Sequence, residues 1–341
     1  MKKQGNQTYL LSNPVSILST ASIVGPKEKA GPLHKYFDKC LEDEFWGEKS
    51  WEKAESKIIK EASNLAITKS KLPSDKIDFC FAGDLLNQCI SSSFGLRESN
   101  IPFFGVFGAC STFVESLILG AMTIDGDFAE NVLCAASSHF CSAEKQFRFP
   151  LELGNQRSPS SQWTVTGSGA SVISKNAPQN TDVPTLKITS VTPGKIVDMG
   201  IKDASNMGAA MAGAACDTLV THLSDLNRIP NYYDAIFTGD LGYIGKSLLI
   251  DLAKEKDLLI ESLYDDCGVL IFDKSTQDTH AGGSGCGCIA TVFSSYIYQK
   301  MQEKNLNKVL LIATGALTNA TTTAQGESIP GIAHAISIEN I

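Results

Sequence analysis

Cys110 is the residue of this chain whose type and setting best suit chemistry. It stands in the run Phe107-Gly-Ala-Cys-Ser-Thr112, directly before an apolar stretch at 113–124. The glycine and the apolar stretch predict a sharp turn from a strand into a helix, with Cys110 at the helix N-terminus. The free N–H groups and the dipole there favour a thiolate or a bound anion. The alternative is a small buried cysteine that packs inside the turn.

Two aspartates, Asp84 and Asp240, follow predicted strands at equivalent places in the chain. A carboxylate at such a strand end could orient a ligand amide, bind a cation such as Ca²⁺ or act as a base. Each could equally cap the helix that follows it. Asn87 lies in the first turn after Asp84, where its amide could hydrogen-bond a ligand or simply be exposed.

Two basic side chains complete the candidates. His139 ends a predicted strand at 132–138, so we expect it at the same edge as the Cys110 turn, as a base or a hydrogen-bond donor. Arg148 follows in an irregular segment and could meet a carboxylate ligand bidentately. The alternative for each is an exposed loop residue.

An internal repeat predicts the elements that position these residues. Asp78-Phe-Cys-Phe-Ala-Gly-Asp-Leu85 recurs as Asp234-Ala-Ile-Phe-Thr-Gly-Asp-Leu241, and each half then has a Gly-rich turn, a helix and an apolar strand. Alternating strands and helices favour a parallel sheet with right-handed crossovers. We therefore predict two duplicated α/β halves, 1–178 and 179–341, joined by a polar linker. The second half carries extra chain with a strand-like run at 267–272.

Composition excludes several classes of protein. The net charge is −8, without a basic run, which argues against nucleic acid as the main partner. The 10 cysteines are too sparse and irregular for a secreted disulfide scaffold. We find neither an export signal nor an apolar stretch of about 18 residues that could span a membrane. Any membrane attachment is therefore expected to be peripheral.

The duplication and the two Gly- and Cys-containing turns resemble the thiolase superfamily, especially its ketoacyl-synthase III-like members. The resemblance implies αβαβα layers with two mostly parallel five-stranded sheets, and an acyl nucleophile at Cys110. The family's partner residues are a histidine, and a second histidine or an asparagine. The matching runs, Gly239-Asp-Leu-Gly-Tyr-Ile-Gly245 and Ala281-Gly-Gly-Ser-Gly-Cys-Gly-Cys288, contain neither. A nucleophile without a base and an oxyanion donor is a poor catalyst.

A closer resemblance is to the stage V sporulation protein AD family. It extends over nearly the whole chain and rests on nine separate motifs. They are Ala30-Gly-Pro-Leu33, Ala82-Gly-Asp-Leu-Leu-Asn-Gln88, Phe107-Gly-Ala-Cys-Ser-Thr112, Ser137-Ser-His139, Gln146-Phe-Arg148, Thr164-Val-Thr-Gly-Ser-Gly-Ala170, Phe237-Thr-Gly-Asp-Leu241, Ala281-Gly-Gly-Ser-Gly-Cys286 and Glu327-Ser-Ile-Pro330.

This resemblance implies a non-catalytic binding protein for dipicolinic acid, taken as its calcium chelate, without a cofactor of its own. The protein would be a peripheral subunit at the spore inner membrane, working with the membrane proteins of the SpoVA system during sporulation and germination, and thiolase-like folds suggest a homodimer. The implied ligand-binding residues are Cys110, Asp84, His139, Asp240, Asn87 and Arg148. Two alternatives stay open. One is an acyltransferase or condensing enzyme that uses Cys110, with His139 as base, and the other is an assembly scaffold with a vestigial pocket.

Overall fold

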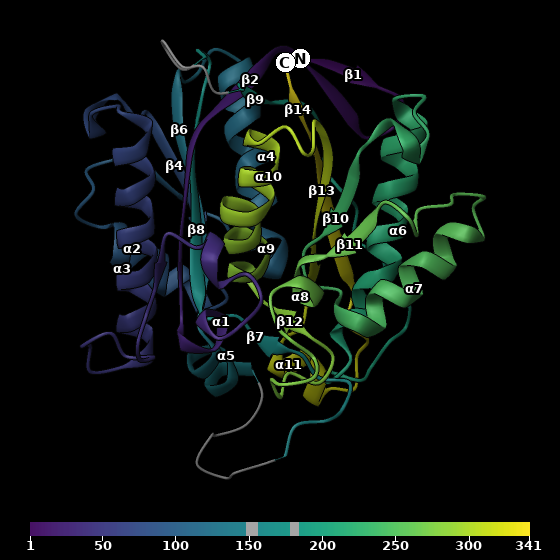
Figure 1. The fold of residues 1–341 in the computed structure, drawn as a ribbon. Helices are drawn as coiled ribbons and strands as arrows, with labels where there is room; N and C mark the ends of the chain where they lie inside the picture. Colours follow the sequence, from purple (N-terminus) through teal and green to yellow (C-terminus); the bar gives the residue numbers. More distant parts are fainter. Residues whose placement is uncertain (148–155, 178–183) are drawn as a thin grey trace.

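The chain folds into five layers, with two sheets held between three layers of helices. The computed structural model describes residues 1–147, 156–177 and 184–341. Figure 1 shows helices α2 (Trp51–Ser70) and α3 (Ile90–Leu96) outside the first sheet, and α6 (Met207–Asp225) and α7 (Gly242–Lys254) outside the second. The layer between the sheets holds α4 (Thr112–Asp125), α9 (Cys286–Val292) and α10 (Tyr298–Gln302). The predicted αβαβα arrangement is confirmed.

The first sheet has the strand order β5-β4-β6-β8-β2. Its strands are β2 (Thr8–Val24), β4 (Phe79–Gly83), β5 (Phe103–Gly105), β6 (Asn131–Ser138) and β8 (Gly167–Ser174). Smaller elements flank it: β1 (Lys2–Gln4), α1 (Pro26–Lys29), β3 (Lys39–Cys40), α5 (Phe140–Phe147) and β7 (Trp163–Thr164).

The second sheet has the matching order β11-β10-β13-β14-β9. Its strands are β9 (Leu186–Thr192), β10 (Ala235–Thr238), β11 (Tyr264–Asp266), β13 (Lys308–Ala316) and β14 (Gly331–Asn340). The remaining elements are α8 (Cys267–Leu270), β12 (Gly283–Ser284) and α11 (Ala320–Ala324). The two sheets meet where β2 pairs with β9, at Tyr9 opposite Val191 and Val15 opposite Ile188. The long strand β2 thus belongs to both.

Strand direction agrees with the predicted mostly parallel sheets, because four of the five strands in each sheet run the same way and one runs against them. β4 is parallel to β5 and β6, and β10 is parallel to β11 and β13. However, β8 is antiparallel to both β6 and β2, and β14 is antiparallel to both β13 and β9. Strand β8 starts beside the end of β6, with Gly167 opposite Ser138, and β14 starts beside the end of β13, with Gly331 opposite Ala316, so each pair is antiparallel.

The repeat is visible in hydrogen bonds as well as in strand order. Asp78 precedes β4, and its carboxylate accepts the backbone N–H groups of Glu130 and Asn131 at 2.7 and 3.0 Å. Asp234 precedes β10 and accepts those of Asn307 and Lys308 at 2.6 and 3.0 Å. The first residue of each repeated motif therefore fastens the start of the neighbouring strand in the same way.

One prediction is corrected by the structure: the run at 267–272 begins as helix α8 instead of a strand. Asp266 lies at its N-cap and accepts the backbone N–H of Val269 at 3.2 Å. The strand in this region is β11, which lies just before the predicted run. The predicted boundary between residues 178 and 179 falls at 178–183, outside the described residues.

The interior is formed where the central helices meet both sheets. The rings of Phe113 on α4 and Phe293, just after α9, are fully buried and lie 5.8 Å apart. Both chain termini lie at one end of the molecule, and α5 and α11 lie at the other (Figure 1). Within the described residues, no helix is long and apolar enough to cross a membrane.

Candidate functional site

The predicted turn at Cys110 is present and is unusually tight. Ala109 has a φ of 51°, in the left-handed region that non-glycine residues seldom adopt. The Sγ of Cys286 donates to the carbonyl of Ala109 at 3.0 Å, and Thr112 Oγ1 donates to the same oxygen at 2.7 Å. The turn leads into α4, whose bounds agree with the predicted helix. Cys286 comes from the other half, so both halves hold Cys110 in place.

The equivalent turn of the second half lies directly against the first. Gly285 has a φ of 100°, and a Cβ atom there would lie 2.7 Å from Ser138 Oγ. Glycine is therefore required both by the backbone conformation and by the close approach of β6. This contact brings the starts of α4 and α9 together at the centre of the molecule.

Cys110 lies near a carboxylate. The negative charge of Asp240 acts on the thiol of Cys110. The Asp240 carboxylate accepts Thr314 Oγ1 at 2.7 Å and the Gly285 N–H at 3.1 Å. Burial raises the pKa of Asp240 to about 6, although these hydrogen bonds oppose the shift. Burial, and then the negative charge of Asp240, raise the pKa of the Cys110 thiol well above its ordinary value. Cys110 is thus a neutral thiol at physiological pH.

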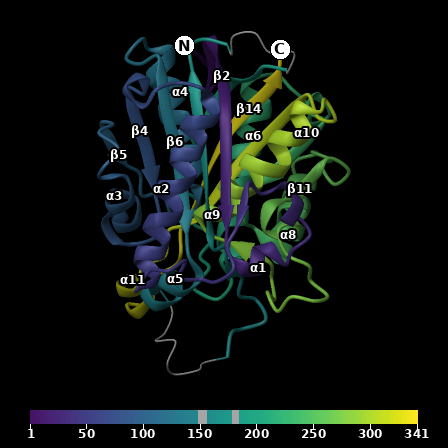
Figure 2. The same cartoon turned by 60° about the vertical axis from the view of Figure 1, so that its left-hand side comes forward.

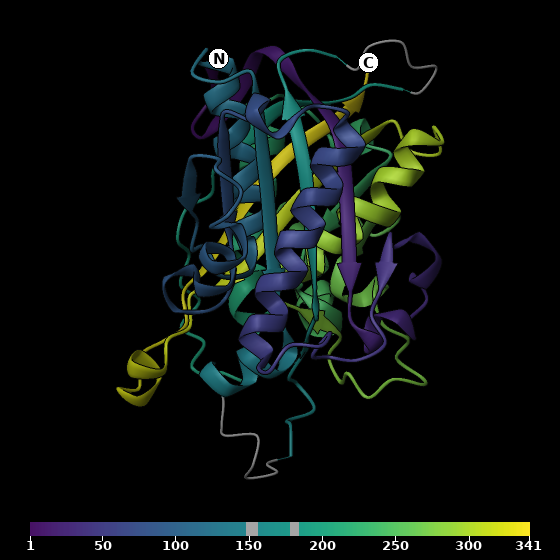
Figure 3. The same cartoon turned by 90° about the vertical axis from the view of Figure 1, so that its left-hand side faces the viewer.

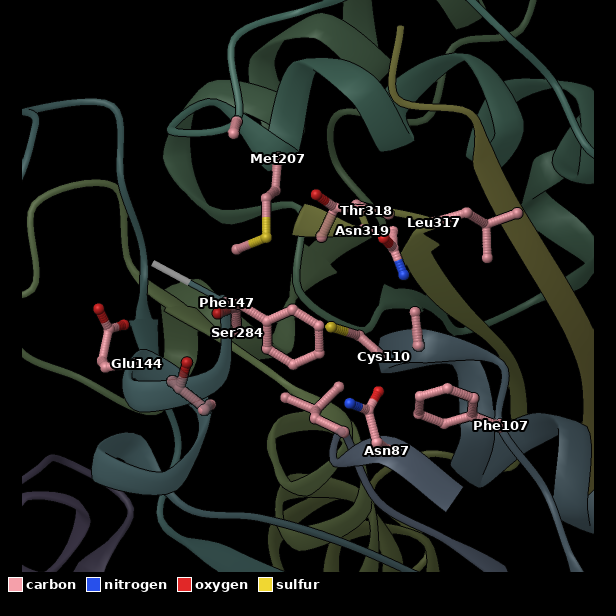
Figure 4. Close-up of a pocket in the computed structure, with 16 residues that line it drawn as sticks. Asn87, Phe107, Cys110, Glu144, Phe147, Met207, Ser284, Leu317, Thr318 and Asn319 are labelled. Atoms are coloured by element: carbon pink, nitrogen blue, oxygen red, sulfur yellow. The ribbon is translucent and has the colours of Figure 1, made fainter. Parts of the chain in front are cut away.

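A cavity of about 260 Å³ opens beside this thiol. Figure 4 shows Cys110 at its centre, with Phe107, Phe147, Asn87 and Asn319 around the same space. Most of the lining is apolar: Leu85, Phe107, Ala109, Ala143, Phe147, Ala204, Met207, Ala316 and Leu317. The remaining lining residues are Asn87, Cys110, Glu144, Thr164, Ser284, Thr318 and Asn319. Rings and a few polar groups around a partly open cavity suit a small, flat, polar ligand.

Among the described residues, the side chains that line the cavity carry a net negative charge. Glu144 is the charged residue among the described lining, which includes no lysine, arginine or histidine. Over the same residues there is no group of three or more His, Cys, Asp or Glu that could hold a metal ion. A bare dianion would find little compensation from the described side chains.

Asp84 is buried behind the cavity wall instead of lining it. Its carboxylate accepts the Leu86 N–H at 2.9 Å, and the N–H and Oγ of Ser92 at 2.7 and 2.6 Å. These bonds shape the loop into α3, which is close to the capping role that we considered as the alternative. Asp84 therefore supports the chain segment that carries Asn87.

His139 is also buried and does not line the cavity. Its Nδ1 accepts the Cys141 N–H at 3.2 Å, so Nε2 carries the proton and donates to the Glu44 carbonyl at 2.9 Å. Burial lowers the pKa of His139. Both ring nitrogens hydrogen-bond to backbone groups of the protein. The position of His139 at a strand end did not indicate these partners.

The structure therefore brings together only part of the predicted set. Cys110 and Asn87 line the cavity, Asp240 lies directly behind Cys110, and Arg148 lies outside the described residues. Gln146 holds the Asn87 segment by accepting the Asn87 N–H and donating to the Leu85 carbonyl, each at 3.0 Å.

Sequence reasoning missed most of the apolar wall and the segment 317–319. Phe107 was within a motif that we had singled out, and its place next to the turn was the available signal. Segment 317–319 follows β13 and is separated from Cys110 by about two hundred residues, so only the fold reveals their proximity.

Comparisons with known sequences give a consistent result. The chain matches the family described as "Stage V sporulation protein AD (SpoVAD)" over residues 5–339. It is 44% identical to stage V sporulation protein AD of Bacillus subtilis (strain 168) over 339 residues, which cover 99% of this chain and 98% of that protein.

Comparisons with solved structures reflect the fold alone, because the identities are low. A variant of OleA from Xanthomonas campestris, with cerulenin, has a TM-score of 0.62 and 13% identity, covering 97% of each chain. The 3-oxoacyl-[acyl-carrier-protein] synthase III of Aquifex aeolicus VF5 has a TM-score of 0.55 and 11% identity, covering 95% of this chain and 99% of that one. Human mitochondrial 3-ketoacyl-CoA thiolase in complex with CoA has a TM-score of 0.55 and 12% identity, covering 97% and 99%. The predicted thiolase-like fold is confirmed.

Proposed function

The chain belongs to the stage V sporulation protein AD family, and on that premise we propose that it is a non-catalytic binding protein for dipicolinic acid. The observation that supports binding over catalysis is the thiol of Cys110, which lies in a cavity beside a carboxylate rather than beside a histidine or a cation that would favour the thiolate. An acyl-transfer site needs a thiolate and donors for an oxyanion. Here Asp240 disfavours the thiolate.

The cavity chemistry supports the calcium chelate as the bound form. Dipicolinate is a flat pyridine ring with two carboxylates, and its complex with one Ca²⁺ has no net charge. The rings of Phe107 and Phe147 offer apolar contacts to such a ring, and the oxygens of Asn87, Glu144 and Thr318 are of the type that Ca²⁺ prefers. A neutral chelate also avoids placing two further negative charges beside Glu144.

The direct test is a binding isotherm with sodium dipicolinate, recorded with and without one equivalent of Ca²⁺. We expect saturable binding that is tighter with calcium. Equal binding with and without Ca²⁺ would contradict the calcium chelate as the bound form but would still support dipicolinate as the ligand. No binding heat in either experiment would overturn the proposed function.

A matched pair of phenylalanine variants checks the location of the ligand. Phe107→Ala removes a ring from the cavity, and Phe128→Ala removes an exposed ring that does not line it. We expect binding about fivefold weaker in the first variant, since one aromatic contact contributes about 1 kcal/mol, and unchanged binding in the second. Equal effects would place the ligand elsewhere.

We further propose that the protein acts as a peripheral subunit at the spore inner membrane, with membrane-embedded partners that carry the solute across. Two alternative functions, an enzyme and an assembly scaffold, predict different experimental results. Stable acylation of Cys110 by acyl-coenzyme A, seen by intact mass, would favour an enzyme. Recruitment to the membrane partners without binding of dipicolinate or of an acyl donor would favour the assembly scaffold.

A further inference from the structure

We propose that Gln146 is a positioning residue that joins two walls of the cavity and so sets how tightly the cavity holds its ligand. One wall is the end of α5, where Ala143 and Phe147 line the cavity on either side of Gln146. The other wall is the loop after β4, which lines the cavity with Leu85 and Asn87. The effect on affinity rests on the proposed function, whereas the joining of the walls does not.

The carboxamide of Gln146 engages the loop at two points. Its Oε1 accepts the Asn87 N–H at 3.0 Å, and its Nε2 donates to the Leu85 carbonyl at 3.0 Å. The side chain therefore spans the residue between them as a neighbouring strand would. A carboxamide turned the other way would place its NH₂ group against an N–H and its oxygen against a carbonyl. Both bonds thus depend on one orientation of one side chain.

The loop that Gln146 engages has a strained backbone. Gln88 and Cys89 have φ angles of 58° and 52°, so two successive non-glycine residues lie in the left-handed region. Such conformations persist where the surrounding structure holds them in place. The Cys89 thiol donates to the Val106 carbonyl at 3.3 Å on one side of the strained pair, and Gln146 holds Asn87 on the other. Without Gln146, we expect the strained pair to relax and the Asn87 carboxamide to leave its place.

Two hydrogen bonds that Gln146 does not make report on the loop as a whole. The Leu86 N–H donates to Asp84 Oδ1 at 2.9 Å, and the Cys89 N–H donates to the Leu86 carbonyl at 3.0 Å. If Gln146 served only to bond its own two partners, removing it would leave these amides protected. If it positions the loop, they should open as well.

The first experiment is hydrogen exchange of the full chain without ligand, resolved to single amides by electron-transfer fragmentation. In Gln146→Ala we expect the Leu86 and Cys89 amides to exchange at least about tenfold faster, and the amides of β6 to be unchanged. Gln299→Ala is the control, because it removes an exposed glutamine on α10 that does not line the cavity. It should leave both amides as they are in the unaltered chain.

The second experiment is a double-mutant cycle, read as the affinity for calcium dipicolinate. Gln146→Ala should bind about fivefold more weakly than the unaltered chain, and Gln299→Ala should bind equally well. In a chain that already carries Asn87→Ala, adding Gln146→Ala should weaken binding by less than about twofold, because the group that Gln146 positions is gone. A further fivefold loss in that chain would overturn the positioning role.

Two exchange results would overturn the inference without any ligand. One is a Gln146→Ala chain whose Leu86 and Cys89 amides exchange as slowly as those of the unaltered chain. The other needs no variant, and is an unaltered chain in which these amides are no better protected than in urea. If no chain binds calcium dipicolinate but Gln146→Ala exchanges faster, the proposed function is overturned and the joining of the walls is supported.

Discussion

Asn87 presents a carboxamide to the cavity that makes no hydrogen bond within the described part of the chain, while its backbone N–H is held by Gln146. An exposed carboxamide that makes no hydrogen bond to the described part of the chain is available to meet a ligand. Cys110, in contrast, is buried, and its thiol is held neutral by that burial and by the nearby charge of Asp240. Among the predicted site residues that line the cavity, Asn87 is therefore the stronger candidate for a direct hydrogen bond.

Asn87→Ala should weaken the binding of calcium dipicolinate by about five- to tenfold, because a net hydrogen bond contributes about 1 kcal/mol. Titration calorimetry measures the change. Asn64→Ala removes an exposed asparagine on α2 and should leave the affinity unaltered. If Asn87→Ala binds as tightly as the unaltered chain, the carboxamide does not contact the ligand.

Glu55 is a buried carboxyl group on α2 that accepts hydrogen bonds from two serines. Ser142 Oγ donates to Glu55 Oε2 at 2.7 Å, and Ser137 Oγ donates to Glu55 Oε1 at 3.0 Å. Burial, and then the charge of Asp84, raise the pKa of Glu55 to about 8. Burial likewise raises the pKa values of Glu28 and Asp266 to about 7.

The free energy of unfolding should therefore fall as pH rises from 6.5 to 8. In this window the unfolded chain has already lost these carboxyl protons and the folded chain still holds them, so a higher pH favours unfolding. The histidines with lowered pKa, His139, His222 and His334, act in the opposite direction but below about pH 6.5.

Glu55→Gln should flatten this slope by up to about 1.4 kcal/mol per pH unit, the contribution of one titrating group. Urea unfolding at several pH values measures it. Glu52→Gln, one turn earlier on α2, is the control, because Glu52 has a lowered pKa and is ionised throughout the window. A slope that is identical in Glu55→Gln and the unaltered chain would contradict a proton on Glu55.

At the scale of elements, the paired clamps of Asp78 and Asp234 are the clearest product of the duplication. Each carboxylate accepts two backbone N–H groups at the start of the neighbouring strand. Because the two clamps have the same geometry, they should contribute similarly to stability.

Asp78→Ala and Asp234→Ala should each lower the free energy of unfolding by about 1–3 kcal/mol, since two donors lose their acceptor. Urea unfolding at fixed pH measures both. Asp75→Ala, at an exposed position nearby, should have an effect within about 0.5 kcal/mol. A large loss in only one half would show that the clamps are not equivalent.

These elements also show what the sequence could predict. Repeated motifs, Gly-rich turns and apolar runs are local signals, and they gave the strands, the central helices and the Cys110 turn. The direction of β8 and β14 depends on where the chain returns after a long connection, and so does the hydrogen-bond partner of His139. His139 is satisfied by the Glu44 carbonyl, which lies 95 residues away in the chain. No local pattern carries that information.

At the scale of the whole molecule, the free edge of the first sheet is the most apolar exposed feature. All three residues of β5 are exposed, and Ile90 and Phe94 of α3 add exposed apolar surface. Figure 2 shows β5 and α3 on one side of the molecule, and Figure 3 shows the segment around α11 projecting beyond its body. The run at 100–108 carries no charged residue that would oppose pairing with its own copy.

We therefore expect two copies to associate through antiparallel pairing of their β5 strands, an arrangement that a two-fold axis makes self-complementary. Light scattering coupled to gel filtration should give a dimer mass. Phe103→Glu should yield monomers, while Phe128→Glu, on another exposed ring, should not. A monomeric unaltered chain at micromolar concentration would contradict this arrangement.

The chain termini lie at the end of the molecule opposite α5 and α11, whose neighbourhood contains the cavity. A fused domain or an affinity handle at either terminus would therefore extend away from the cavity mouth. A surface that captures the protein by such a handle would display the cavity outward, with the ligand path unobstructed. The termini and the cavity therefore lie at opposite ends of the molecule.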